Sequence, residues 1–561
     1  MKDRSKHGTP KAEALIAAVL VLTAGAGLAR AEEPAEQTPA EDTGAPAQTP
    51  AEDTGAPAAT SVRPSAPVET APTTSPPAVT PTVEAPPLPA EPPPSAVPAP
   101  PAEPLASAPL PGATSPSQPA APDSWFARPP LTLVVGEGTR QFKLTIFGFV
   151  EVDYIYDTTR SYNDAMGSSL VQPDNTYAGR HSRSQFSMRN SRLGFAFESP
   201  TVGGVKPTAV LEADFFGHQD SPPETSESVF FDSPTFRVRH AYMKLETAYV
   251  DVVMGQTYDL FGWQNFSAPC SLQYLGLPNQ LFSRNPQLRL SHGFNAEGAV
   301  GLDVAVSANR PAQRDSQIPD GHAGLRITLN RWLGLTTPGS VGTRTQPAGI
   351  GVSGIVRRFN VNAHVPPPPR ASVSATGWGI AADAFVPVIP AAHEGDRSNR
   401  LTLVGSFVWG TGIADLITTG GNAQFPPLEN PLQIIPWPEY EANIDSSLVT
   451  FDADGGVHTL NWLAFRAGVQ YYLPPTGRLL FAANYTQSHS NNLWKLFLKG
   501  DALVELRTMM AHTSRYVDAN LFWDATPALR LGISGQYTQV EYLDGNKPHN
   551  IRGMAQTVYV F

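Results

Sequence analysis

The sequence predicts an all-β protein, a transmembrane antiparallel β-barrel of roughly sixteen strands that follows a disordered region rich in proline and alanine. Three observations lead to this prediction. Apolar residues recur at every second position from residue 131 onward, which is the period of a half-buried strand. Charged residues make up only 16% of the 561 residues, below the roughly 25% of soluble domains. The chain also ends in two aromatic residues spaced two apart, Tyr559 and Phe561.

The first segment has the pattern of an export signal. Lys2, Arg4 and Lys6 begin a basic region, and residues 14–28 form an apolar run that ends in small residues. This run is shorter than the roughly 20 residues of a membrane-spanning helix, so an uncleaved anchor helix is the weaker alternative. We therefore expect residues 1–31 to be a signal peptide with a cleavage site near Ala31.

The second segment, residues 32–123, has the composition of a disordered linker. The sequence QTPAEDTGAPA fills residues 37–47 and repeats without change at residues 48–58. Proline lacks a backbone N–H and fixes φ, and large apolar residues are too few to offset the entropy of an ordered chain. Two roles remain open for this segment, a plain linker or a tether that contacts the cell wall.

The third segment, residues 131–561, is the predicted barrel domain. Val150, Val152 and Tyr154 alternate with Glu151 and Asp153, and similar runs recur to the C-terminus between turn residues. A soluble β-sandwich also alternates, but a stretch this long is large for one soluble β-domain. In lipid no water can hydrogen-bond to the backbone N–H and C=O groups of a sheet edge, so the edges of the sheet must be joined to each other. Tilted strands of about 9–11 residues then give roughly sixteen strands, with fourteen or eighteen also open, and a water-filled lumen.

Five stretches resemble the DcaP-like trimeric porins, a family of outer-membrane barrels. They are residues 188–195 (MRNSRLGF), 211–217 (LEADFFG), 236–242 (FRVRHAY), 255–261 (GQTYDLF) and 518–527 (DANLFWDATP). The resemblance implies a sixteen-stranded porin of the outer membrane that forms homotrimers and passes small, often negatively charged solutes. Members commonly carry an N-terminal coiled coil, which the proline-rich segment replaces here. Tyr559 and Phe561 are similar to the terminal signal by which outer-membrane barrels are inserted.

Successive side chains of a strand point to opposite faces, so the parity of a position (odd or even within its strand) tells whether it faces lipid or the lumen. By this parity, charged residues fall on the lumen side. Seven arginines fall opposite the lipid-facing positions: Arg192, Arg237, Arg239, Arg289, Arg326, Arg466 and Arg530. Acids share that wall: Glu212, Asp214, Glu151, Asp153, Glu198, Asp303 and Asp518. These groups either brace the wall as ion pairs or form a charged constriction, because rings of charged side chains set pore selectivity. For the second case we expect Arg237 and Arg239 to face Glu212 and Asp214 across the pore.

One long connection differs from the rest. Residues 259–286 (DLFGWQNFSAPCSLQYLGLPNQLFSRNP) are rich in aromatic and polar residues. We expect this loop to fold inward and narrow the pore, with Arg284 and Asn285 near its end; an ordinary outer loop is the alternative. Cys270, the single cysteine, lies within it and is expected to be a passive thiol. Residues 366–370, 393–400 and 422–447 are expected to be extracellular loops.

The composition also excludes several classes of function. A net charge of −11 argues against a nucleic-acid-binding protein. The sequence contains no H-E-x-x-H, G-x-S-x-G or phosphate-loop motif, so we expect neither an enzyme nor a cofactor. The leading hypothesis is a porin for passive diffusion of small hydrophilic solutes, with anions such as carboxylates favoured. The alternatives are a non-selective porin, or an envelope tether or adhesin built on a barrel.

Overall fold

The computed structural model describes residues 131–167, 169–217, 234–264, 266–311, 316–362, 372–420, 447–451, 457–493 and 510–561. The predicted signal peptide and linker lie outside these residues. So do the predicted loop 366–370 and nearly all of 422–447. No helix within the described ranges is long and apolar enough to cross a bilayer.

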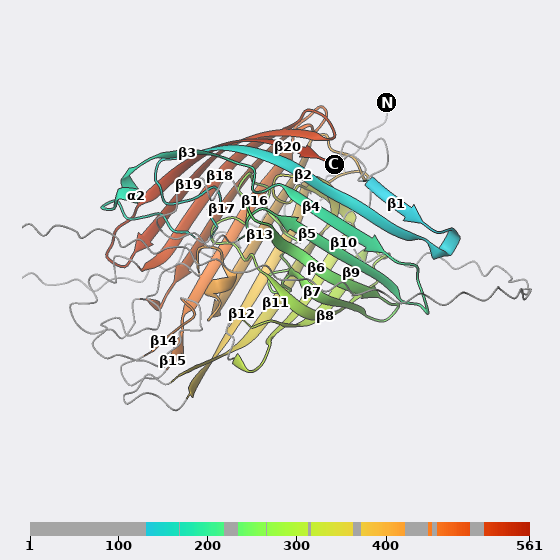
Figure 1. Ribbon diagram of the computed structural model, residues 1–561, viewed down its shortest axis with the longest axis horizontal. Helices are drawn as coiled ribbons and strands as arrows, with labels where there is room; N and C mark the ends of the chain where they lie inside the picture. Colours follow the sequence, from blue (N-terminus) through green and yellow to red (C-terminus); the bar gives the residue numbers. More distant parts are fainter. Residues whose placement is uncertain are drawn as a thin grey trace, which may run out of the picture. The chain divides into compact units, whose positions relative to one another are not determined.

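Strands make up almost all of the described chain (Figure 1). The strands are β1 (Leu131–Val135), β2 (Phe142–Asp157), β3 (Arg183–Ser187), β4 (Arg192–Glu198), β5 (Lys206–Asp214), β6 (Arg237–Glu246), β7 (Asp251–Tyr258), β8 (Arg284–Phe294), β9 (Val300–Asn309), β10 (Asp320–Thr336), β11 (Arg344–Asn362), β12 (Ser372–Ile389), β13 (Arg400–Thr411), β14 (Val449–Phe451), β15 (Val457–Thr459), β16 (Asn461–Tyr472), β17 (Leu479–Ser490), β18 (Ala511–Asp524), β19 (Leu529–Tyr542) and β20 (His549–Val560). The helical segments of the described ranges are short: η2 (Gly138–Arg140), α2 (Tyr177–Arg180) and η4 (Ala414–Leu416).

The main sheet closes on itself. It contains eighteen of the described strands, and each pairs antiparallel with its neighbours. Strand β2 is the seam: it pairs with β20 along one edge and with β4 along the other. The short strand β1 pairs with β2 on the same side as β20, and β3 pairs with β2 on the same side as β4. Each pair therefore shares one position, and the eighteen strands fill sixteen positions around the ring. The predicted count of roughly sixteen strands is therefore confirmed, and closure satisfies every edge that lipid would leave unpaired.

The chain end completes the seam. The backbone N–H of Phe561 donates to the Gly148 carbonyl at 3.1 Å, and the Gly148 N–H donates back to the Phe561 carbonyl at 3.2 Å. A Cβ on Gly148 would lie 2.9 Å from the Phe561 ring, so the close approach of the terminal ring requires glycine. Tyr559 points outward from β20 and is exposed. Their role as an insertion signal stays a prediction.

Alternation sorts the two faces of the wall. On β2, Val150, Val152 and Tyr154 are exposed on the outside, whereas Glu151 and Asp153 between them are fully shielded inside. On β19, Ile533 faces outward and Gln536 is buried inward. An apolar outer face with a polar interior is the pattern of a membrane barrel, and it confirms the predicted parity.

Outward-facing aromatic residues lie toward both ends of the strands. Trp523 and Tyr559 lie near the end that carries the C-terminus. At the opposite end, Trp378 on β12 and Trp409 on β13 pack edge to face, with ring centroids 4.9 Å apart. Aromatic bands at both lipid interfaces are expected of an outer-membrane barrel.

The connections differ at the two ends of the ring. At the end that carries Phe561, the strands are joined by connections such as 247–250, 295–299 and 473–478, and the inward-folding loop leaves from the other end.

One sequence prediction is corrected here. Residues 393–400 were expected in an extracellular loop, but the connection of β12 to β13 lies at the end of short turns. Its polar composition resembles that of an outer loop, and only the strand order reveals its side.

Candidate functional site: an arginine patch on the inner wall

A long loop crosses the inside of the barrel. We name residues 259–283, between β7 and β8, the inner loop. The backbone N–H of Gly262 donates to Ser353 Oγ of β11 at 2.7 Å, and Ser271 Oγ donates to Asp518 of β18 at 2.6 Å. Strand β18 stands half-way around the ring from β8. The prediction that this loop folds inward is therefore confirmed.

The inner loop is packed as a core element. Leu272 and Tyr274 join a buried cluster with Phe522 and Met554 of the wall. Cys270 belongs to the same cluster and is fully shielded. Burial raises the pKa of the Cys270 thiol, because a thiolate is disfavoured in apolar surroundings. This agrees with the expected passive thiol.

Five of the predicted lumen residues meet on one side of the wall. Arg237 of β6 binds Asp214 of β5 through two hydrogen bonds, at 3.0 and 2.5 Å. Arg239 lies between both acids, 2.9 Å from Asp214 and 2.7 Å from Glu212. Arg192 of β4 completes the group at 3.9 Å from Glu212. With Arg284 these residues form what we call the arginine patch.

A β-bulge explains the dense charge of the patch. The β5–β6 register shifts between Glu212 and Ala213, so that His240 lies opposite Glu212 and Val238 opposite Ala213. Arg239 is the additional residue. A bulge lets two consecutive side chains point to one face, and Val238 remains on the outside. His240 lies beside the patch, with Nδ1 3.1 Å from Thr257 Oγ1.

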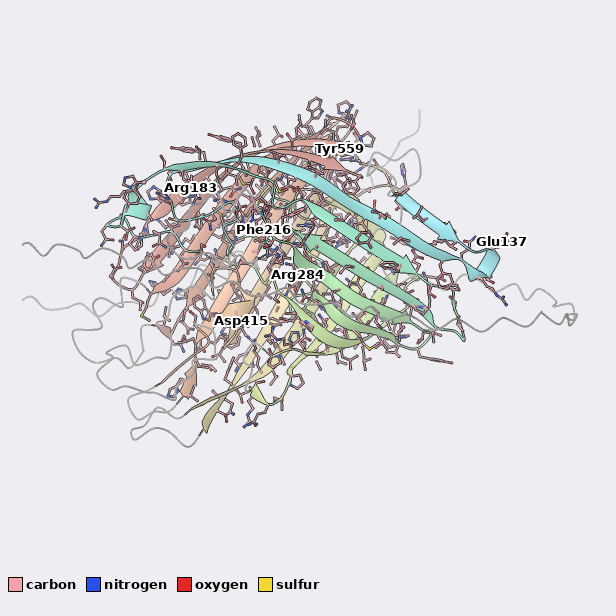
Figure 2. The ribbon with its side chains drawn as sticks, in the orientation of Figure 1. Glu137, Arg183, Phe216, Arg284, Asp415 and Tyr559 are labelled. Atoms are coloured by element: carbon pink, nitrogen blue, oxygen red, sulfur yellow. The ribbon has the colours of Figure 1, made fainter. Side chains whose placement is uncertain are left out.

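Arg284, at the first position of β8, adds a fourth guanidinium to the patch (Figure 2). It lies over the Phe282 and Tyr258 rings, 5.3 and 5.7 Å from their centroids. Its Nη1 is buried without a hydrogen-bond partner, and no carboxylate of the described residues forms an ion pair with it. Three arginines of the patch, Arg239, Arg237 and Arg192, act on it electrostatically. Four guanidiniums therefore share two carboxylates.

The geometry corrects one expectation for this site. Glu212 and Asp214 were expected to face the arginines across the pore. Instead they bind Arg237 and Arg239 directly, because β5 and β6 are neighbouring strands in register. No transverse field arises from these pairs, and the surplus of positive charge lies on one wall.

The other predicted arginines are inside the barrel but apart from the patch. Arg289 donates to Gln287 at 2.9 Å, and Arg326 pairs with Asp303 at 2.9 Å while lying over the Trp263 ring. Arg466 donates to Ser267 of the inner loop. Arg530 binds Asp524 at 2.6 Å and the Ser340 carbonyl at 2.8 Å. Arg466 and Arg530 are almost fully shielded from solvent.

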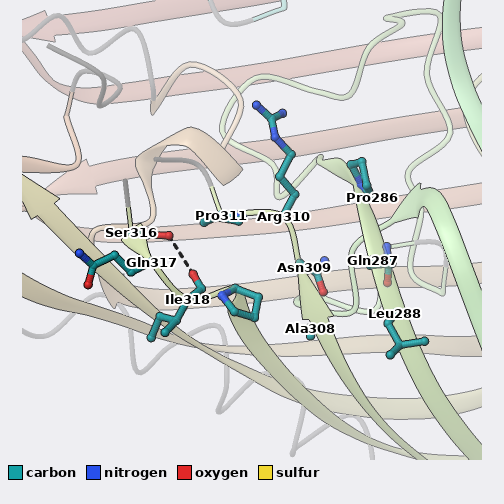
Figure 3. Close-up of a pocket in the computed structure, with 11 residues that line it drawn as sticks. Pro286, Gln287, Leu288, Ala308, Asn309, Arg310, Pro311, Ser316, Gln317 and Ile318 are labelled. Atoms are coloured by element: carbon teal, nitrogen blue, oxygen red, sulfur yellow. Dashed lines mark hydrogen bonds between the residues drawn. The ribbon is translucent and has the colours of Figure 1, made fainter. Parts of the chain in front are cut away.

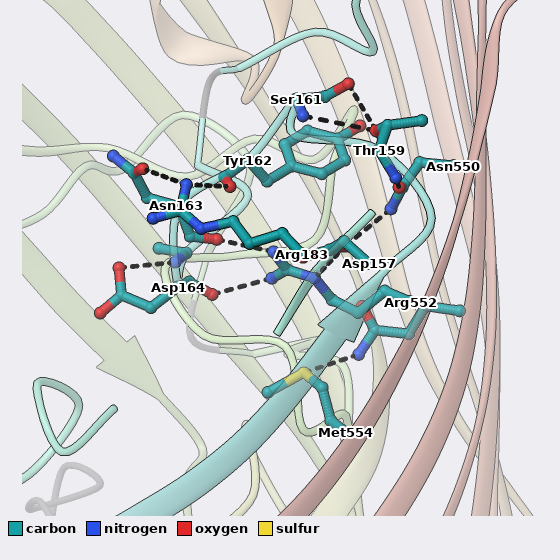
Figure 4. A network of polar contacts seen from close by, with 12 residues as sticks. Asp157, Thr159, Ser161, Tyr162, Asn163, Asp164, Arg183, Asn550, Arg552 and Met554 are labelled. Atoms are coloured by element: carbon teal, nitrogen blue, oxygen red, sulfur yellow. Dashed lines mark hydrogen bonds and ion pairs between the residues drawn. The ribbon is translucent and has the colours of Figure 1, made fainter. Parts of the chain in front are cut away.

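Several buried ion pairs were missed by the sequence analysis, and Arg552 and Arg357 form three of them. Arg552 of β20 binds Asp157 of β2 at 2.8 Å, and its Nη1 also donates to the Asp164 carbonyl (Figure 4). Arg357 of β11 joins Asp320 and Asp415 at 2.9 and 2.5 Å. Both arginines alternate with outward apolar residues, so the same parity argument would have placed them inside.

A separate hollow of about 560 Å³ lies at the rim of the barrel (Figure 3). Pro286, Leu288, Ala308 and Ile318 line part of it. Leu288 and Ile318 are exposed outer residues, so this hollow is not part of the path through the lumen.

The comparisons with known proteins agree with the fold. No protein-family model and no curated protein matches the chain. The crystal structure of the outer membrane channel DcaP of Acinetobacter baumannii matches with a TM-score of 0.52 and 17% identity, over 75% of this chain and 97% of that one. The described chain has the DcaP fold. An anion-selective porin from Comamonas acidovorans also matches, with a TM-score of 0.41 and 10% identity, over 75% of this chain and 100% of that one.

The outer surface of the ring has the residues that a membrane-spanning barrel requires. The DcaP-type ring is closed, and its outer face in this chain is apolar between two sets of aromatic residues. These are the fold and the outer surface of an outer-membrane barrel.

Proposed function

We propose that the chain is a porin of the outer membrane that lets small hydrophilic anions, such as carboxylates, diffuse passively. The observation that carries the proposal is Arg284, a guanidinium without a carboxylate partner beside three other arginines. An anion that passes the patch would exchange part of its hydration water for N–H donors of the guanidiniums, whose planar fork suits a carboxylate. The apolar outer belt would contact membrane lipid.

The inner loop supports this function by shaping the path. Its anchors to β11 and β18 keep it across the lumen, and its last residues lead directly into Arg284. A solute that passes between the loop and the β4–β6 wall therefore meets the arginine patch. The DcaP-like resemblance favours a homotrimer, which we include in the proposal.

Ion selectivity in planar bilayers tests the proposal. We expect the reversal potential of the purified protein under a KCl gradient to show a preference for chloride. Arg284→Gln should reduce the permeability ratio of anion to cation by about fivefold, since one charge at about 4 Å in water changes the energy by roughly 1 kcal/mol. Arg284→Lys should retain most of the preference.

The matched control is Arg515→Gln. Arg515 is a half-exposed arginine beside Glu541, away from the patch, and its loss should leave selectivity unchanged. A wild-type channel without charge preference would overturn anion selection and favour the non-selective porin. Equal effects of Arg284→Gln and Arg515→Gln would also remove Arg284 from the mechanism.

A further inference from the structure

The hollow at the rim of the barrel arises from small residues on the outer wall (Figure 3). Leu288 of β8, Ala308 of β9 and Gly321 of β10 lie side by side in the ladder, and all three positions are exposed. Alanine and glycine project little from the sheet, so the wall is low there, while Leu288 and Ile318 are larger apolar residues of the lining. The volume of about 560 Å³ falls within the roughly 300–1,000 Å³ of ligand sites.

Backbone contacts fix the lining of the hollow. The Arg310 N–H donates to the Pro286 carbonyl at 2.9 Å, which holds the end of β9 beside β8 beyond their last ladder pair. Ser316 Oγ donates to the Ile318 carbonyl at 2.8 Å in the segment that enters β10. The lining is therefore preorganised, which lowers the cost of binding a ligand.

Arg310 gives the hollow a cationic edge. Its side chain lines the hollow and is exposed, and no carboxylate of the described residues forms an ion pair with it. Asp320, the first residue of β10, is buried inside the wall and binds Arg357 at 2.9 Å. The outer side of this part of the rim therefore carries a positive charge that no described acid balances.

The hollow lies where the apolar outer belt ends. On the side toward the Phe561 end of the ring, Leu290, Val306 and Leu325 continue the exposed apolar faces of β8, β9 and β10. Arg310 and Gln317 are exposed polar residues at the hollow itself. A molecule bound there therefore has lipid acyl chains on one side and the polar headgroup region on the other.

We propose that this hollow binds one membrane lipid that has a phosphate-bearing headgroup. The phosphate pairs with Arg310, because a guanidinium offers two parallel N–H donors to phosphate oxygens. The first part of an acyl chain packs on Leu288, Ala308 and Ile318, a contact that a dissolved anion cannot make. The site is on the outside of the barrel, so this inference does not depend on anion passage through the arginine patch.

Native mass spectrometry of the full chain in a non-ionic detergent tests the site. The probes are dioleoylphosphatidylglycerol and dioleoylglycerol, which differ in the phosphate-bearing headgroup. The wild type should retain one phosphatidylglycerol per chain and bind dioleoylglycerol at least about fivefold more weakly, the factor for one charge pair in water.

Two variants separate the headgroup from the acyl chain. Arg310→Gln should weaken phosphatidylglycerol binding about fivefold for the same reason and leave dioleoylglycerol binding unchanged. Ala308→Trp fills the hollow at an outward position where a barrel accepts an aromatic side chain, and it should weaken the binding of both lipids. Arg331→Gln changes an exposed arginine toward the opposite end of β10 and should bind both lipids like the wild type.

Several results would overturn the site. One is equal binding of the two lipids by the wild type, a measurement that needs no variant to fold. Another is equal weakening by Arg310→Gln and Arg331→Gln, which would indicate general attraction of anionic lipid. Displacement of the lipid by inorganic phosphate would assign the hollow to a dissolved anion. If Ala308→Trp changes the number of chains per particle but not lipid binding, the hollow is a contact between copies of the chain instead.

Discussion

Arg552 of the last strand and Asp157 of the first long strand form an ion pair in which both side chains are fully shielded, with Nη2 and Oδ2 2.8 Å apart. The two residues face each other in the β2–β20 register. The pair therefore links the two ends of the barrel domain across the seam. Asn550 donates to the same carboxylate at 2.8 Å.

Removal of one partner from this pair should destabilise the barrel strongly. Arg552→Met leaves Asp157 buried and unpaired, which should cost about 3–5 kcal/mol in the free energy of unfolding. Denaturant unfolding in detergent, followed by tryptophan fluorescence, measures this loss. Arg515→Met breaks a half-exposed pair with Glu541 and should cost at most about 1 kcal/mol. Equal losses in the two variants would contradict a structural role of the seam pair.

Cys270 reports whether the inner loop is docked. Because the thiol is fully buried and burial raises its pKa, the folded protein should not react with a maleimide at neutral pH. The unfolded chain should react at its single cysteine. Mass spectrometry after timed labelling measures both rates. Rapid labelling of the folded protein would show that the loop leaves the lumen.

Asn279 should hold the inner loop against the far wall. Its side chain donates to Thr486 at 3.2 Å and accepts hydrogen bonds from Thr419 and Ser488 at 2.7 and 2.8 Å. Asn279→Ala removes these bonds, at about 1–3 kcal/mol for the groups left unsatisfied. We expect noisier single-channel currents and about tenfold faster labelling of Cys270. Asn330→Ala, within β10, where the side chain donates to the Ala296 carbonyl of the β8–β9 turn, should change neither.

Gly255 should tolerate no side chain. Its φ of +121° is unfavourable for other residues, and a Cβ would lie 2.3 Å from the Ala241 carbonyl oxygen. Gly255→Ala should therefore lower the free energy of unfolding by about 1–3 kcal/mol. Gly535→Ala is the control, because a Cβ there meets nothing within 4 Å. A smaller loss for Gly255→Ala than for Gly535→Ala would contradict the description of β7.

The period-two pattern predicted the faces of the strands, and the length of the alternating stretch, the low share of charged residues and the terminal aromatic residues favoured a barrel over a sandwich. Val150 and Glu151 were assigned correctly because adjacent residues in a strand point to opposite faces. Parity also placed Arg192, Arg237 and Arg239 of the patch inside, whereas Arg284 was expected near the end of the inward-folding loop. It gave no register between strands, so it could not show that Glu212 and Asp214 bind Arg237 and Arg239 rather than oppose them.

Other features depended on contacts between distant residues. The Asp157–Arg552 pair joins residues at the two ends of the domain, and only closure of the ring brings them together. The bulge at Arg239 arises from one shifted position between β5 and β6, which alternation alone does not reveal. The side assigned to residues 393–400 was wrong because loop composition does not tell which end of a strand a connection joins.

The closed ring should conduct ions although the inner loop crosses it, and conductance in planar bilayers tests this most directly. The purified full chain should insert with currents that rise in three equal steps, one for each pore of a homotrimer, and the open-channel current should favour anions. Folded protein that inserts into the bilayer but carries no current would contradict the account.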